Sequence, residues 1–273
     1  MGKFDGILIC TDLDGTLYKN DKTISRENRE AIEYFKREGG YFTFITGRMP
    51  YYSTDAYNSA EPNVPFGCIN GGGVYDGAKM QYIWALEISR DVVELIGYID
   101  ERFDGIGIQV CGMYNTYFAE DNEMTKKFIA RTGLPSLICD YRRIEEPVGK
   151  IIFSSEEGDV LTAIEKALRE HPMGEKFDYI RSEKTLFEIL PKGVTKGTAL
   201  AKLCEYLSVD IGKTVAIGDF DNDVAMLREA GLGIAVANAS KSALDAADTV
   251  TVSNEEHAIA EVIFGLESGK YAL

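Results

Sequence analysis

Short, continuous apolar runs separated by helical patterns constrain the fold of this chain more than any other feature of its sequence. Residues 7–10 and 41–45 lack the alternation of a half-exposed strand, and the pattern between them predicts a helix over residues 25–38. The same order returns in the last third, where a helix from Lys196 precedes a strand over 214–217. Such strands are typical of a parallel sheet covered on both faces. We therefore predict an α/β fold in which both ends of the chain build one doubly wound, Rossmann-like parallel-sheet core.

The middle of the chain follows a different pattern. Its predicted elements are helices near 91–103, 124–132 and 160–170, and paired strands over 108–111 and 114–119 and over 179–181 and 186–190. This mixture predicts an α+β domain inserted into the first, and 273 residues are enough for both. We expect the core to comprise residues 1–82 and 188–273, and the insert residues 83–187.

Composition and charge exclude several classes of protein. No segment approaches the ~18 uninterrupted apolar residues of a membrane span, and the N-terminus lacks a basic region and a cleavage site, so we expect an untargeted, cytoplasmic protein. The five cysteines are widely spaced without a C-x-x-C pair, which favours reduced core cysteines over zinc ligands. The net charge of −15 argues against nucleic acid as a partner, because phosphate backbones are bound by basic patches.

Polar segments follow several of the predicted strands, at the ends where open parallel sheets bind ligands. These segments are Thr11-Asp12-Leu13-Asp14-Gly15-Thr16, Thr46-Gly47-Arg48, Asn70-Gly71-Gly72 after a strand over 66–69, and Gly218-Asp219-Phe220-Asp221-Asn222-Asp223. Lys196 adds a cation from the start of a helix. A phosphate group with a divalent cation would need this combination of carboxylates, hydroxyls, amides and ammonium. The alternative is that Asp, Asn, Thr and Gly here simply form caps and turns.

Two details favour a binding site over simple turns. Thr195 reads as a helix N-cap, which places Lys196 in the first turn, where the helix dipole disfavours a cation by ~0.3–1 kcal/mol. A bound anion would reverse that cost. The second detail is the density of acidic residues at this edge, namely Asp12, Asp14, Asp219, Asp221 and Asp223. These carboxylates would repel one another without a metal or a proton, and hard oxygen ligands with only two histidines in the chain indicate Mg²⁺ rather than zinc.

The motifs match, in order and spacing, those of a known family. Asp12-Leu13-Asp14-Gly15-Thr16-Leu17, Thr46-Gly47-Arg48, Asn70-Gly71-Gly72, Lys196-Gly197 and Gly218-Asp219-Phe220-Asp221-Asn222-Asp223 resemble the signature of the haloacid-dehalogenase-like phosphohydrolases. The insert resembles the large α+β cap of the Cof-type, or IIB, subfamily. The resemblance covers nearly the whole chain, and it implies a phosphatase that works through an aspartyl phosphate.

The resemblance implies a role for each matching residue. Asp12 would be the nucleophile, and Asp14 would protonate the leaving oxygen and then accept a proton from water. Mg²⁺ would be held by the Asp12 carboxylate, the Asp14 backbone carbonyl and Asp219, with Asp223 either a direct ligand or a residue that positions one. Thr46, Gly47, Arg48, Asn70, Lys196 and Asn222 would surround the phosphate. For Arg48 the alternative is a salt bridge that ties loops together, and Asp221 is expected to be solvated.

The resemblance implies a small phosphorylated metabolite as the substrate, with a sugar phosphate as the first expectation. A phosphosugar mutase is one alternative, but the fourth motif is more compact than in the mutases of this fold. A catalytically silent phospholigand-binding protein is another, but it would be expected to lack Asp12 or Asp14, and both are present. Residues of the insert that could select the substrate, by type alone, are Tyr114, Tyr117, Arg142, Arg143 and Arg181. Core packing of the tyrosines and surface exposure of the arginines are the alternatives.

Overall fold

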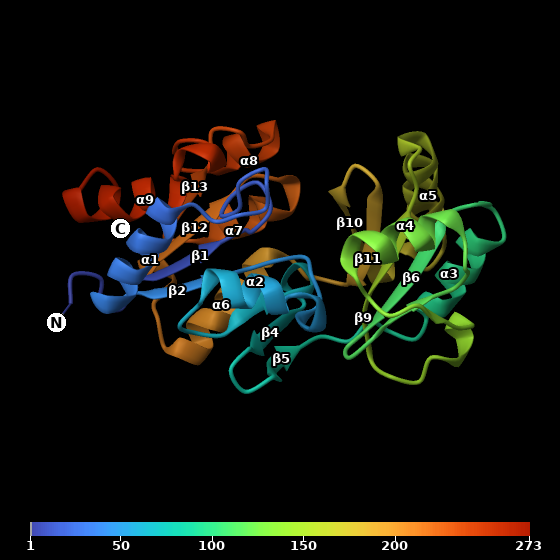
Figure 1. The fold of residues 1–273 in the computed structure, drawn as a ribbon. Helices are drawn as coiled ribbons and strands as arrows, with labels where there is room; N and C mark the ends of the chain where they lie inside the picture. Colours follow the sequence, from blue (N-terminus) through green and yellow to red (C-terminus); the bar gives the residue numbers. More distant parts are fainter. Residues whose placement is uncertain (1) are drawn as a thin grey trace. The chain divides into compact units, whose positions relative to one another are not determined.

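The structure, a computed structural model, describes residues 2–273 and divides into two compact units (Figure 1). The first unit comprises the chain up to Trp84 and again from Thr195, and the second comprises Ala85–Val194. The second unit extends beyond the expected residue 187, because the hairpin of β10 and β11 belongs to its sheet as a whole. The two units are described separately below.

The first unit is built on a five-stranded parallel sheet with the order β14-β13-β12-β1-β2. Its strands are β1 (Leu8–Thr11), β2 (Tyr41–Phe44), β12 (Thr214–Gly218), β13 (Leu232–Ala235) and β14 (Thr249–Val250). β1 lies between β12 and β2 and so joins the two ends of the chain, since β2 follows it in sequence whereas β12 comes after the insert. The predicted doubly wound α/β core is confirmed.

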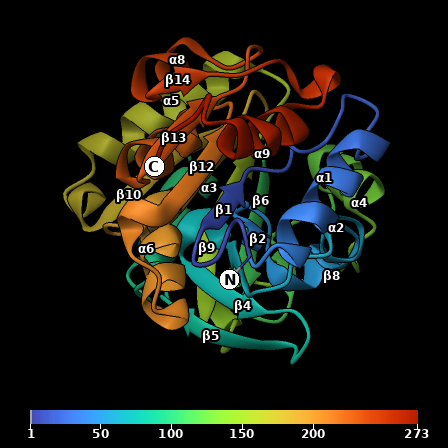
Figure 2. The ribbon, with the colours of Figure 1, turned by 90° about the vertical axis from the view of Figure 1, so that its left-hand side faces the viewer.

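Helices cover both faces of this sheet, as Figure 2 shows. They are α1 (Arg26–Arg37), α2 (Thr54–Ala60), α6 (Lys196–Leu207), α7 (Val224–Glu229), α8 (Lys241–Ala246) and α9 (Ala258–Ser268). α1 packs on α9, and α6 packs on α7. Leu200 and Leu203 of α6 contribute to one core with Leu8 and Cys10 of β1. Ser25, where this helix was predicted to begin, is the N-cap of α1, and its side chain accepts a hydrogen bond from the backbone N–H of Asn28.

The predicted strand over residues 66–69 is placed differently from the expectation. β3 (Phe66–Cys68) forms a small sheet of its own with β4 (Gly73–Asp76) and β5 (Gln81–Ala85). A single bridge between Ile45 and Gly67 joins it to the end of the parallel sheet. The expectation that this run belongs to the parallel sheet was wrong, because a continuous apolar run does not distinguish a buried parallel strand from a buried hairpin strand.

The second unit has a six-stranded sheet of order β10-β11-β9-β6-β7-β8, antiparallel except between β7 and β8. Its strands are β6 (Gly107–Gly112), β7 (Thr116–Phe118), β8 (Leu137–Ile138), β9 (Val148–Ser154), β10 (Phe177–Glu183) and β11 (Leu186–Pro191), and its helices are α3 (Val92–Asp100), α4 (Glu123–Thr132) and α5 (Gly158–Glu170). Leu95 of α3 and Ile164 of α5 pack against Ile151 and Phe153 of β9, so these helices and the sheet share one core.

Two findings concern the whole described chain. Across residues 2–273, no helix has both the length and the apolar character needed to cross a bilayer. No disulfide joins the five cysteines of the described chain, and four of them are buried.

Candidate active site

The parallel sheet brings residues from opposite ends of the chain to one edge. Thr11 at the end of β1 pairs with Ile217 of β12 and with Phe44 of β2. Asp12 extends this ladder by one residue, because its backbone N–H donates to the Ile217 carbonyl at 2.8 Å. The residues that follow the three strands therefore meet at the carboxyl edge of the sheet.

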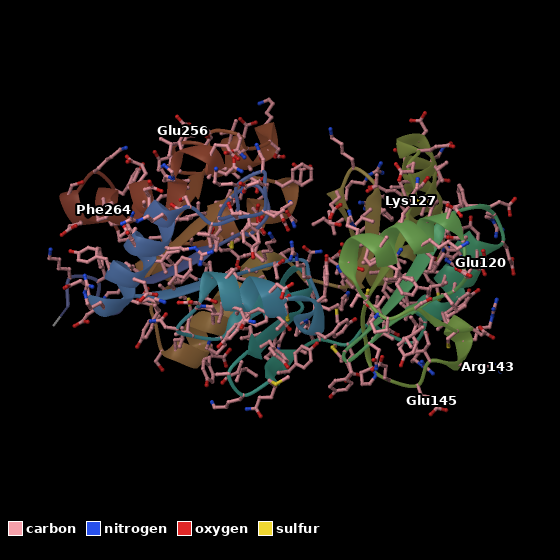
Figure 3. All side chains as sticks on the ribbon, viewed as in Figure 1. Glu120, Lys127, Arg143, Glu145, Glu256 and Phe264 are labelled. Atoms are coloured by element: carbon pink, nitrogen blue, oxygen red, sulfur yellow. The ribbon has the colours of Figure 1, made fainter. Side chains whose placement is uncertain are left out.

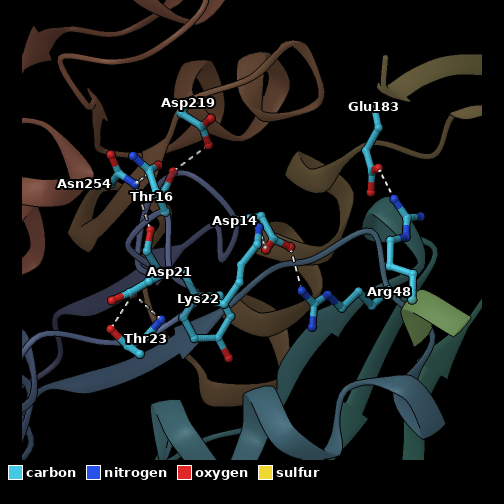
Figure 4. Close-up of polar contacts among 12 residues, drawn as sticks. Asp14, Thr16, Asp21, Lys22, Thr23, Arg48, Glu183, Asp219 and Asn254 are labelled. Atoms are coloured by element: carbon cyan, nitrogen blue, oxygen red, sulfur yellow. Dashed lines mark hydrogen bonds and ion pairs between the residues drawn. The ribbon is translucent and has the colours of Figure 1, made fainter. Parts of the chain in front are cut away.

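Three carboxylates gather at this edge. Asp12, Asp219 and Asp223 each offer an oxygen, and these oxygens lie within 4.8 Å of one another. Thr16 Oγ1 donates to Asp219 Oδ1 at 2.8 Å, as Figure 4 shows. A side chain at position 15 would place its Cβ 2.5 Å from Asp219 Oδ2, and Gly15 has φ +86°. Glycine is therefore required for the close approach of these two loops.

Lys196 is buried between two of these carboxylates. Its Nζ lies 2.5 Å from Asp12 Oδ1 and 2.6 Å from Asp223 Oδ1. Thr195 caps α6 as predicted, its side chain accepting from the Thr198 amide, and Lys196 is the first residue of the helix. Removal of this cation would leave buried carboxylates uncompensated.

Asp223 uses both oxygens within the protein. Oδ1 accepts from Lys196, and Oδ2 accepts from the backbone N–H groups of Asp219 and Phe220 at 2.9 and 3.0 Å. The Asp223 carboxylate thus fixes both the ammonium and the turn that carries Asp219.

Burial and neighbouring charges act on these groups in opposite directions. Burial raises the pKa of Asp12 well above its usual range, an effect that Lys196 opposes and that Asp223 and Asp219 reinforce. Burial and the Asp223 charge raise the pKa of Asp219 to about 6. For Lys196, burial lowers the pKa, but Asp12 and Asp223 outweigh burial and raise it. A bound divalent cation would relieve the repulsion among the carboxylates, and three hard oxygen donors suit Mg²⁺.

Asp14 lies between two cations instead of in the carboxylate cluster (Figure 4). Its Oδ1 accepts from Lys22 at 2.9 Å and its Oδ2 from Arg48 at 2.8 Å. Burial alone would raise the pKa of Asp14, but Arg48 and Lys22 outweigh burial and hold it below its usual value. Arg48 also lies over the Tyr52 ring, 5.3 Å from its centre. The salt bridge that was the alternative role for Arg48 is therefore present, and it joins Arg48 to Asp14, the expected general acid.

The other residues predicted to surround the phosphate contact one another in a second group. Asn222 Nδ2 donates to Asn70 Oδ1 at 3.1 Å, and the backbone N–H of Asn70 donates to the Thr46 carbonyl. A Cβ at Gly47 would lie 2.8 Å from Asn70 Oδ1, so this approach also depends on glycine. The structure thus brings Thr46, Gly47, Asn70 and Asn222 together.

Asp221 and the insert residues lie outside both groups. Asp221 is exposed and accepts from Ser240 at 3.0 Å. In the second unit, Arg142 and Arg143 pair with Asp140, and Arg143 projects from the surface in Figure 3. The other candidates there are Arg181, which donates to the Gly158 carbonyl at 3.1 Å, Tyr114, whose side chain is exposed, and Tyr117, which is half-buried.

Two site residues were missed from the sequence. Thr16 belongs to the first motif, and its position in that motif could have identified it as a site residue. Lys22 carried no comparable signal, because its contact with Asp14 depends on a turn in which Lys22 itself adopts φ +64°.

Comparisons with known proteins identify the family of this chain. Residues 9–263 match the haloacid dehalogenase-like hydrolase family. A Bacillus subtilis protein named 5-amino-6-(5-phospho-D-ribitylamino)uracil phosphatase YitU is 31% identical over 94% of this chain and 96% of its own length. A second B. subtilis protein of the same activity, YcsE, is 28% identical over 94% of each chain.

Solved structures give the same result. A haloacid dehalogenase-like hydrolase from Bacteroides thetaiotaomicron superposes with a TM-score of 0.83 at 26% identity, covering 96% of this chain and 99% of that one. TM0651 from Thermotoga maritima superposes with a TM-score of 0.81 at 26% identity, covering 98% of both chains. The chain therefore belongs to the haloacid dehalogenase-like hydrolase family, and it is a phosphatase of that family.

Proposed function

We propose that this enzyme hydrolyses a small phosphorylated metabolite in a Mg²⁺-dependent reaction that passes through an aspartyl phosphate on Asp12. The observation that carries the proposal is the position of Lys196, whose ammonium is fully buried between Asp12 and Asp223 while Asp219 faces the same point. A helix-terminal ammonium among buried carboxylates is suited to the binding of an anion together with a cation.

In the first step, an oxygen of Asp12 attacks the phosphorus atom and the bond to the leaving oxygen breaks. That oxygen departs with the bonding electrons and takes a proton from Asp14. In the second step, water attacks the aspartyl phosphate, Asp14 accepts the water proton, and inorganic phosphate leaves. The Asp12 carboxylate is then restored.

The metal would be held by the Asp12 and Asp219 carboxylates and the Asp14 backbone carbonyl. When bound, Mg²⁺ supplies positive charge that offsets the charge of the phosphoryl oxygens. Because both Asp223 oxygens are already engaged, we assign Asp223 to the positioning of Lys196 and of the Asp219 turn.

The phosphoryl oxygens would be bound by Lys196 and by the group around Thr46, Gly47, Asn70 and Asn222. Arg48 lies at the border of this group, bonded to Asp14. An incoming phosphate would offer Arg48 a second anionic partner, so we expect it to contact phosphate and Asp14 in turn.

The names of the relatives support a phosphate ester of a sugar-like alcohol as the substrate. Two relatives act on 5-amino-6-(5-phospho-D-ribitylamino)uracil, in which a ribityl chain carries the phosphate. We propose that this compound or a sugar phosphate is the substrate here.

Release of inorganic phosphate tests the proposal. We expect hydrolysis of p-nitrophenyl phosphate and of 5-amino-6-(5-phospho-D-ribitylamino)uracil with Mg²⁺, none after EDTA treatment, and recovery when Mg²⁺ is returned. Full activity after exhaustive chelation would contradict metal dependence. Consumption of a sugar phosphate without release of inorganic phosphate would favour a mutase instead.

A further inference from the structure

The segment between Asp14 and α1 leaves the sheet and has little regular structure of its own. It turns back on itself, with the Lys19 amide donating to the Thr23 carbonyl at 2.9 Å. Asp14, which the proposed function makes the general acid, is 42% exposed in its side chain. The position of the Asp14 side chain therefore depends on the contacts that fix this segment.

Asn254, far along the chain, holds the segment from one side (Figure 4). The residue is 3% exposed, and its Nδ2 donates to the Tyr18 carbonyl at 2.9 Å and to Asn20 Oδ1 at 3.3 Å. The side chain of the next residue, Glu255, accepts from the backbone N–H of Asn20 at 2.7 Å. A buried amide that binds a backbone carbonyl fixes its position, because loss of the partner leaves the carbonyl unsatisfied.

Asn238 holds the same segment nearer to Asp14. Its Nδ2 donates to the carbonyl of Gly15, the residue directly after Asp14, at 2.8 Å. Its Oδ1 accepts from the backbone N–H of Asn254 at 2.9 Å, so the two asparagines are themselves connected. The two partners also fix which end of the Asn238 amide is oxygen and which is nitrogen.

From these contacts we infer that Asn238 and Asn254 are positioning residues, which together hold the segment from Gly15 to Asn20 so that Asp14 can transfer a proton to the leaving oxygen. The inference rests on the proposed function, in which Asp14 is the acid. Neither asparagine touches the reacting atoms. Proton transfer is sensitive to small displacements of the acid, whereas the Asp12 carboxylate is held by Lys196, so we expect its attack to be affected less.

The test compares two aryl esters of similar size. p-Nitrophenolate leaves without help from an acid, whereas the more basic phenolate of phenyl phosphate needs protonation. We expect Asn238→Ala and Asn254→Ala to lower kcat for phenyl phosphate by roughly 10- to 100-fold. Activity with p-nitrophenyl phosphate should stay near the wild-type value, and so should KM for both esters.

A matched control separates positioning from general loosening of the fold. Asn28 of α1 is also buried, and its Oδ1 accepts from the Ala260 amide of α9, away from Asp14. Asn28→Ala should lower the melting temperature without changing the ratio of the two activities. Asn238 is exposed, so Asn238→Ala keeps the test valid if Asn254→Ala fails to fold.

Asp14→Asn completes the design. The relevant quantity is the ratio of kcat for phenyl phosphate to kcat for p-nitrophenyl phosphate. The inference predicts that Asp14→Asn lowers this ratio, and that adding Asn238→Ala to Asp14→Asn lowers it no further. If Asp14→Asn lowers the ratio but the asparagine variants do not, the positioning role is overturned while the acid role stands. The same holds if the double variant Asp14→Asn/Asn238→Ala shows the product of the two single losses. If Asp14→Asn leaves the ratio unchanged, the acid role fails and the inference fails with it.

Discussion

In the proposed mechanism, Asp12 is the residue on which the reaction depends most directly. Asp12→Asn keeps the shape of the side chain but removes the attacking charge, so we expect kcat to fall more than ~100-fold, a loss above ~3 kcal/mol. Phosphate release from p-nitrophenyl phosphate with Mg²⁺ measures this loss. Asp221→Asn is the matched control, because Asp221 lies outside the carboxylate cluster on an exposed turn and should retain activity. A smaller loss for Asp12→Asn would show that another group attacks.

Asp219 makes the stability of the metal-free protein depend on pH. Its pKa is raised from 3.8 to about 6 in the folded state by burial and by Asp223. Between those values the folded state binds a proton that the unfolded chain does not, so the free energy of unfolding rises as the pH falls through about 6. We expect the melting temperature in EDTA to rise from about pH 7 to about pH 5 through this group.

Asp219→Asn provides the comparison for this pH effect. The variant should be more stable than the wild type at neutral pH in EDTA, and its melting temperature should vary less with pH. Added Mg²⁺ should stabilise the wild type but not the variant, because the variant lacks one of the proposed ligands. Identical pH profiles for the two proteins would contradict a raised pKa at Asp219.

At the scale of elements, the first residue of α6, Lys196, lies within the carboxylate cluster. Lys196→Met removes the ammonium between Asp12 and Asp223, so we expect both a fall in kcat and a loss of stability of about 3–5 kcal/mol in EDTA. The helix position alone suggested no stabilising role for Lys196, but complete burial with two ion pairs gives it one. Thermal unfolding and kinetics of the same variant measure both effects.

Lys202→Met on the same helix is the control for Lys196→Met. Lys202 pairs with Glu205 near the surface, and such pairs contribute about 0–1 kcal/mol. Mg²⁺ should restore part of the stability lost in Lys196→Met, because a divalent cation can also neutralise Asp12. A Lys196→Met protein with normal kinetics would contradict the role of Lys196 in phosphate binding.

Elements with strong local patterns could be predicted from the sequence, and those set by distant contacts could not. The N-cap at Thr195 and the ends of α1 follow from capping residues and helical periodicity, so they were predicted correctly. β3 was assigned to the wrong sheet, because its apolar residues suit either environment equally well. The grouping of Asp12, Asp219 and Asp223 followed from the rule that parallel strands end together.

Contacts made by turns escaped prediction for a physical reason. The Lys22–Asp14 ion pair and the bond from Asn254 to the Tyr18 carbonyl depend on the path of an irregular segment. No periodicity or spacing encodes such a path, and Asn254 lies 236 residues from Tyr18 in the sequence. The predicted boundary at residue 187 falls inside β11, whereas the second unit extends to Val194, because β11 pairs with β10 in the sheet of that unit.

At the scale of the whole molecule, every residue of the candidate site belongs to the first unit. The parallel sheet and the helices that cover it are also made only of residues outside 85–194. We therefore expect that the first unit carries the chemistry and propose that the insert carries selectivity among substrates.

Excision of residues 85–194 behind a short flexible linker tests this division of roles. The remaining core should keep some Mg²⁺-dependent hydrolysis of p-nitrophenyl phosphate, whereas the ranking of natural phosphate esters should collapse. Circular dichroism must first show a folded core, because removal of a domain can expose apolar surface and cause aggregation. Asp12→Asn in the excised core should abolish the remaining activity, which excludes a contaminating phosphatase. A folded core that ranks phosphate esters as the intact enzyme does would place selectivity in the loops of the first unit, beside the proposed catalytic carboxylates.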